Sequence, residues 1–168
     1  MRCASLALVL VGAGAAHAAT LTVLATDNIF GAGSANPTPA PGGGGGGTAA
    51  QMVSMVGQTS VSFSAAGSVG WAGSPFNGPD GGYFSGTTNI PSVGGISGFN
   101  GPRSGMLVGV FLDGSDPDAL AAPGSIAYGS EADYSLASYA PGLRQVFFIG
   151  DGKTGIDIHP GARIGERF

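Results

Sequence analysis

At 168 residues the chain is long enough for one domain with a hydrophobic core, and its formal net charge is −4. Its six Lys and Arg residues are dispersed, which argues against a nucleic-acid partner because phosphates require a clustered basic face. Glycine contributes 33 residues without a G-X-Y period, which excludes collagen, and 43% of residues are hydrophobic, so wholesale disorder is not expected.

Residues 1–18 are typical of a secretory signal peptide. Arg2 supplies a positive charge, residues 4–16 are almost all small and apolar, and the sequence AHA at 16–18 fits the small-x-small cleavage pattern. We therefore expect cleavage before Ala19 and a secreted, periplasmic or cell-envelope location. The apolar run is short and rich in Gly and Ala, so we expect no stable membrane span in the mature chain.

Composition divides the rest of the chain into four segments. Residues 31–50 are rich in Pro and contain six consecutive glycines, which disfavours regular structure and predicts a loop or linker. No Lys-Ser or Lys-Thr follows these glycines, so a nucleotide-binding loop is not expected. The predicted segments are a first strand region at 19–30, the loop at 31–50, a β-sandwich body at 51–155 and an abbreviated terminal segment at 156–168.

Within the body, short apolar stretches are separated by Gly, Pro, Asn and Ser. Residues 61–64 alternate with the two-residue period of a half-buried strand, and Val69 and Trp71 continue such a pattern. Further strands are predicted at 87–90, 106–112 and 147–149, and one helical turn within 132–139. The sequence therefore predicts an all-β fold, an antiparallel β-sandwich of jelly-roll or galactose-binding-like type.

The tetrapeptide FNGP occurs twice, at 76–79 and at 99–102. Asn-Gly and Pro favour tight bends, and the charged residue that follows changes from Asp80 to Arg103. A repeated ligand site should keep its charge, so we interpret the repeat as turn chemistry used twice.

Five segments in order carry a resemblance to a known family: NIFGAG at 28–33, the Gly-rich loop, FNGPDGG at 76–82, LVGVFLD at 107–113 and FFIGDGKTG at 147–155. Together they resemble exported bacterial proteins that usually carry a C-terminal PEP-CTERM sorting signal and have a galactose-binding-like or lectin-like β-sandwich. More distantly, the layout is similar to calcium-dependent galactose-binding bacterial lectins. The resemblance implies an extracytoplasmic, non-catalytic domain that recognises sugar.

The C-terminal end departs from this pattern. The lectins take most of their calcium and sugar ligands from a late Asn-Asp loop, whereas this sequence stops at Phe168 without such a loop or a PEP motif. We therefore expect a truncated member whose sandwich is incomplete at the C-terminus, and the lectins' ligand residues are not carried over.

Two groups of polar or aromatic residues are candidate sites. Asp113, Asp116 and Asp118 place three carboxylates after a predicted strand, and hard oxygen ligands suit Ca²⁺, although a solvated acidic turn is the commoner explanation. Asn77 and Asp80 are candidate ligands for a sugar hydroxyl or an ion, with capping of their own turn as the alternative. Trp71 is a candidate stacking platform for a sugar ring, or else a core aromatic. No other cofactor is expected.

Catalytic residues are sparse. His159 is the one histidine after the leader, and Cys3 is removed with it, so neither a zinc site nor a cysteine nucleophile can be assembled in the mature chain. We therefore expect a protein that is not an enzyme. The resemblance, together with loops rich in Gly, Asn and Asp, implies binding of extracellular polysaccharide. The alternative is a structural matrix or surface protein without a small ligand.

Overall fold

The computed structural model describes residues 6–11, 19–34, 48–56, 58–69, 77–135 and 140–157. These residues form ten strands and three short 3-10 helices, and they contain no α-helix. The predicted all-β character is therefore confirmed. The strands assemble into one four-stranded sheet and three two-stranded sheets, which are small and unclosed.

The four-stranded sheet has the order β10-β5-β1-β2. It contains β1 (Leu6–Val11), β2 (Thr20–Val23), β5 (Ser60–Ala66) and β10 (Gly152–Asp157), and all of its neighbours are antiparallel. In β5 the side chains of Val61 and Phe63 are buried while that of Ser64 is exposed, as the two-residue period predicted. Strand β1 lies inside the predicted leader, and it separates β2 from β5.

The first strand region at 19–30 contains the strand β2. After β2 the chain makes the two-residue strand β3 (Asp27–Asn28), which pairs in parallel with β4 (Thr48–Ala49). The 3-10 helix η1 (Ile29–Gly31) follows at once, and the Asn28 side chain accepts a hydrogen bond from the N–H of Phe30. Most of the Gly-rich loop, residues 35–47, lies outside the described residues.

Strands β6 (Gly82–Ile90) and β7 (Phe99–Ser104) form an antiparallel ribbon. The strand predicted at 87–90 is thus longer than expected, and the interpretation of the repeat as two turns was wrong for its second copy, which is β7. Pro102 fits a strand because the pairing register is interrupted between Tyr83 and Thr88, opposite this residue, so no ladder partner needs its missing N–H.

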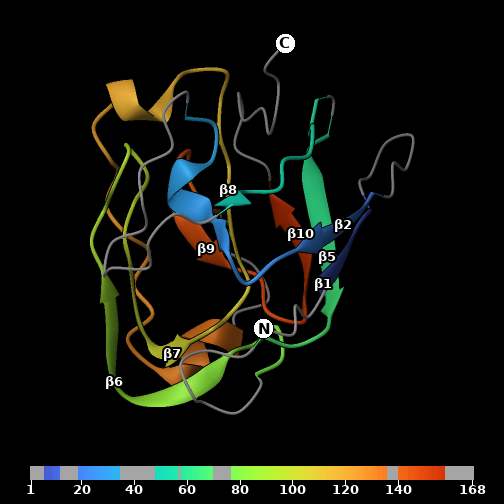
Figure 1. The fold of residues 1–168 in the computed structure, drawn as a ribbon, viewed down its shortest axis with the longest axis vertical. Helices are drawn as coiled ribbons and strands as arrows, with labels where there is room; N and C mark the ends of the chain where they lie inside the picture. The colour runs from blue at the N-terminus through green and yellow to red at the C-terminus, as the bar shows by residue number, and fades with distance from the viewer. Residues whose placement is uncertain are drawn as a thin grey trace.

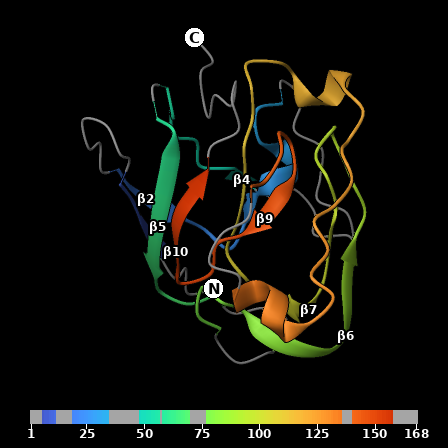
Figure 2. The same cartoon turned by 180° about the vertical axis from the view of Figure 1, so that it is seen from behind.

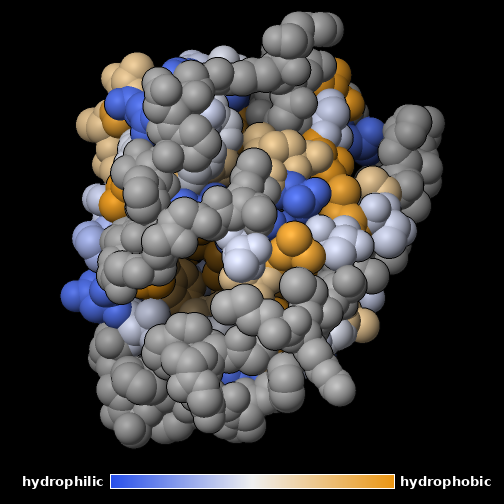
Figure 3. Space-filling view, in the orientation of Figure 1, coloured by the Kyte–Doolittle hydropathy of each residue, from blue (hydrophilic) through white to orange (hydrophobic). Residues whose placement is uncertain are grey.

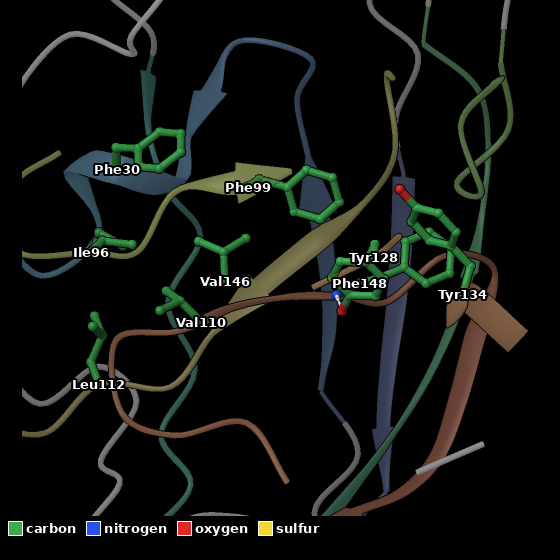
Figure 4. Packing of buried hydrophobic residues seen from close by; sticks show 10 residues of the cluster. Phe30, Ile96, Phe99, Val110, Leu112, Tyr128, Tyr134, Val146 and Phe148 are labelled. Carbon is green, nitrogen blue, oxygen red and sulfur yellow. Dashed lines mark hydrogen bonds between the residues drawn. The ribbon is translucent and has the colours of Figure 1, made fainter. Parts of the chain in front are cut away.

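Strands β8 (Val108–Val110) and β9 (Val146–Phe148) pair between the four-stranded sheet and the β6–β7 ribbon (Figures 1 and 2). Successive β9 side chains point to opposite faces, so β9 contributes to two hydrophobic cores. We call them core 1 (Met55, Val61, Phe63, Leu107, Phe111, Phe147 and Ile149) and core 2 (Phe30, Ala32, Ile96, Phe99, Val110, Leu112, Tyr128, Tyr134, Val146 and Phe148). Figure 4 shows core 2 around β9.

Two buried hydroxyls complete the backbone hydrogen bonding of β9. The N–H of Val146 donates to Ser97 Oγ at 2.8 Å, and the N–H of Phe148 donates to Tyr128 Oη at 2.8 Å. Ser97 is fully buried. A buried hydroxyl without a hydrogen-bond partner would destabilise the fold, and the bond from Val146 provides one. These bonds attach the segments carrying Ser97 and Tyr128 to β9.

The remaining short elements are the 3-10 helices η2 (Pro117–Ala119) and η3 (Glu131–Ser135). The latter confirms the predicted helical turn in its described part. No helix in the described part of the chain is both long and apolar enough to cross a membrane.

Candidate functional site

The residues that directly follow the two FNGP copies, Asp80 and Arg103, are in contact. Arg103, which follows the second copy, donates from Nη1 to the backbone oxygen of Asp80, which follows the first, at 3.0 Å. The ladder pairs Tyr83 with Arg103 and Gly82 with Ser104. The change from Asp to Arg between the copies therefore gives the second copy a donor for the backbone of the first.

The Asp80 carboxylate caps a distant turn. Its Oδ1 accepts a hydrogen bond from the N–H of Asp151 at 2.9 Å, across 71 positions of sequence. Gly150, directly before, has a φ of 65°, and a Cβ there would collide with Asp80 Oδ1. Asp80 thus holds the turn between β9 and β10, whereas the sequence alternative was a cap of its own turn.

Arg103 also fixes the aromatic end of core 2. Its guanidinium contacts Glu131 Oε2 through Nε at 2.9 Å and Nη2 at 2.8 Å. It lies 4.7 Å from the ring centroid of Tyr134 and 5.6 Å from that of Phe148. Burial raises the pKa of Tyr134 above its ordinary value of 10.0, because the phenolate would be desolvated. Arg103 thus connects β7 to η3 and β9, which is a structural role.

The other sequence candidates separate in the structure. Asn77 exchanges two backbone hydrogen bonds with Val69, at 2.8 and 2.9 Å, and its amide lies close to Gly82. Trp71 and His159 lie outside the described residues. Sugar binding by Asn77, Asp80 and Trp71 therefore stays a prediction. In the structure Asp80 is hydrogen-bonded to Arg103 and Asp151.

The acidic loop after β8 is held by local hydrogen bonds. Asp113 Oδ1 accepts from the N–H of Ser115 at 3.0 Å, and Asp116 Oδ1 accepts from the N–H of Asp118 at 3.3 Å, where it caps η2. Asp118 in turn accepts from the hydroxyl of Ser34. Across the described ranges, no group of three or more His, Cys, Asp or Glu side chains is arranged to hold a metal ion. Calcium binding stays a prediction for this loop.

The feature that sequence reasoning missed is an apolar cavity of about 660 Å³. Its walls come from β2, β5, the β6–β7 ribbon, β8 and β9, so it lies between the sheet and the ribbon. Hydrophobic side chains line it from both cores, including Phe63, Phe99 and Phe147. Figure 3 shows hydrophobic atoms inside a hollow on this face of the molecule. The volume falls within the ordinary range of small-molecule sites.

The described chain from Ala50 to Met55 borders the mouth of the cavity. Gln51 and Met52 are exposed there, while Met55 is buried in core 1. Gln51 Nε2 donates to Asp27 Oδ2 at 3.3 Å, and the N–H of Leu24 donates to the same oxygen at 2.9 Å. Polar groups therefore collect at this edge of an apolar cavity.

One sequence signal for the cavity existed. Methionine is flexible and fills irregular space, and Met52, Met55 and Met106, three of the four methionines in the chain, all line the cavity. Met52 and Met55 were visible as an apolar patch at 52–56, but nothing in the sequence placed Met106 opposite them.

No family model, no curated protein and no solved structure matches this chain. The resemblance to PEP-CTERM-associated proteins and lectins therefore stays an expectation from short motifs.

Proposed function

We propose that this protein is an exported, non-catalytic binding protein that holds an apolar small molecule in the cavity between its sheet and its ribbon. The observation that carries the proposal is the cavity itself, which is about 660 Å³ in volume and lined mostly by hydrophobic side chains. Removing apolar surface of a ligand from water would supply the driving force for binding.

The architecture that we propose is sandwich-like. The four-stranded sheet forms one layer, the β6–β7 ribbon forms the other, and β8 and β9 lie between them (Figure 1). The predicted leader supports export, and it supplies β1 to the sheet of the full-length chain. The scarcity of catalytic groups in the sequence supports a role in binding.

The test is a titration of the purified full-length chain with N-phenylnaphthylamine, an uncharged dye that fluoresces in apolar surroundings. We expect saturable binding with one site per chain. Met52→Glu should weaken binding by about tenfold or more, because it places a charge at the rim of an apolar cavity. Met52 is 37% exposed, so the substitution leaves the cores intact.

Leu120→Glu is the matched control. Leu120 is 39% exposed, close to the value for Met52, and it does not line the cavity. This variant carries the same added charge and should bind the dye as the unmodified chain does. Dye fluorescence that does not saturate, or an equal loss in the two variants, would refute the proposal.

Carbohydrate binding through the loops is a second proposal, favoured by the acidic loop in which Asp118 is exposed and Asp113 and Asp116 are partly exposed. Retention on polysaccharide columns that depends on calcium, and that is lost in Asp116→Ala, would support it. The structural alternative, a matrix protein without a small ligand, predicts self-association and indifference to both dye and sugar.

A further inference from the structure

The charge of the cavity wall restricts the class of ligand. Among the described residues that line the cavity, Asp27 is the one charged side chain, and no Lys, Arg or His lines it. The other polar side chains of the described wall are the neutral groups of Gln51, Ser68, Thr88 and Ser104. An anionic end of a ligand that reaches Asp27 would therefore be repelled by its carboxylate, and no described cation of the wall would offset that repulsion.

Asp27 is fixed at the mouth of the cavity. Its Oδ2 accepts hydrogen bonds from the N–H of Leu24 and from Gln51 Nε2, and both of these residues also line the cavity. The Asp27 side chain is half-buried, so its charge is less screened than that of a fully exposed carboxylate. A partly apolar environment strengthens its interaction with a second charge nearby.

We infer that the cavity takes an amphiphile whose polar end is neutral or cationic, such as an alkyl chain ending in a hydroxyl or an amine, and that it rejects anionic lipids. This inference rests on the proposed function, because it names the chemistry of the same site. The alkyl chain occupies the apolar interior, and the hydroxyl or ammonium end lies toward Asp27 and Gln51, where oxygen acceptors can receive its hydrogen bond.

The experiment is displacement of N-phenylnaphthylamine from the full-length chain by dodecanol, dodecylamine and dodecanoate, three probes with the same alkyl chain. We expect dodecanol and dodecylamine to displace the dye, and dodecanoate to be at least about tenfold weaker because of repulsion by Asp27. Asp27→Asn keeps an oxygen acceptor for the N–H of Leu24 and removes the charge. This variant should narrow the gap between dodecanol and dodecanoate to about threefold or less.

Asp113→Asn removes one negative charge outside the cavity and should leave all three displacement curves unchanged. The inference is overturned if dodecanoate displaces the dye as well as dodecanol does, or if Asp27→Asn leaves the gap unchanged, in a chain that still binds the dye. Absence of dye binding would instead overturn the proposed function, and this inference with it.

Discussion

At the scale of single residues, the contacts of Asp80 and Arg103 explain why opposite charges follow the two FNGP copies. The sequence showed two bends followed by opposite charges, and it predicted turns at both places. In the structure Arg103 donates to the backbone of Asp80, while the Asp80 carboxylate caps the turn at Asp151. Both contacts join segments distant in sequence, so local turn preferences could not reveal them. By contrast, Asp113 and Asp116 accept hydrogen bonds from residues only two positions away, which local turn preferences can anticipate.

The Asp80 cap can be tested by stability. Asp80→Ala removes the acceptor for the N–H of Asp151 and should lower the free energy of unfolding by about 1–2 kcal/mol. Asp80→Asn keeps the Oδ1 acceptor and should lower it by less than about 1 kcal/mol. Urea denaturation of both variants measures the difference. Equal destabilisation by Ala and Asn would show that the hydrogen bond to Asp151 contributes nothing.

Because burial raises the pKa of Tyr134, we expect the folded chain to lose stability at alkaline pH. The unfolded chain ionises this tyrosine near its ordinary pKa of 10.0, whereas burial raises the pKa in the folded chain. Below that pH both states keep the proton, so the contribution to stability is complete there. As the pH rises from the unfolded toward the folded pKa, the unfolded state alone loses its proton, and stability falls by up to about 1.4 kcal/mol per pH unit.

Tyr134→Phe removes this ionisation and should flatten the fall in unfolding free energy, relative to the unmodified chain, at pH values above about 10. Urea denaturation at several pH values compares the two slopes. Identical slopes would mean that Tyr134 ionises equally in both states.

At the level of elements, sequence periodicity predicted β5, in which one face is buried, but it missed β7, where the turn preference of Asn-Gly-Pro concealed the alternation of buried and exposed residues. It predicted β8 and β9 as apolar runs, but it could not show that β9 divides two cores, because Val146, Phe147 and Phe148 are all buried and show no alternation. The length of β6 was missed because Gly82 and its neighbours have the composition of a turn. Their pairing with β7 outweighs that preference.

The packing of β8 against β9 depends on Gly109. A Cβ at this position would lie 2.9 Å from both Ile149 Cδ1 and Phe147 Cζ. Gly109→Ala should therefore lower the free energy of unfolding by about 1–3 kcal/mol through overpacking. Gly114→Ala is the control, since a Cβ there has nothing within 4 Å, and it should change stability by less than about 0.5 kcal/mol. Thermal denaturation that fails to separate the two variants would contradict this packing.

For the whole molecule, the leader and the sheet are coupled. Strand β1 lies within the predicted leader and is the neighbour of β2 in the sheet. Removal of residues 1–18 should therefore speed hydrogen exchange of the β2 amides, which lose their ladder partners, while the amides of β8 and β9 stay protected. Exchange measured by mass spectrometry on the full chain and on a chain starting at Ala19 tests this. Unchanged protection of β2 would show that another pairing replaces β1.

The cavity also belongs to the scale of the whole molecule, because its walls come from strands across most of the chain. Composition and periodicity predicted the all-β class, but a cavity depends on how layers are spaced, and no local pattern encodes that spacing. The polar candidates singled out in the sequence, Asp113, Asp116 and Asp118, lie outside the cavity.

The most direct test of the binding proposal uses methionine methyl groups as reporters. In the full-length chain with isotope-labelled methionine methyls, titration with dodecanol should shift the NMR signals of Met52, Met55 and Met106, which line the cavity. The three shifts should saturate together at one ligand per chain. Signals that stay fixed throughout the titration, or shifts that do not saturate, would contradict an apolar binding site between the sheet and the ribbon.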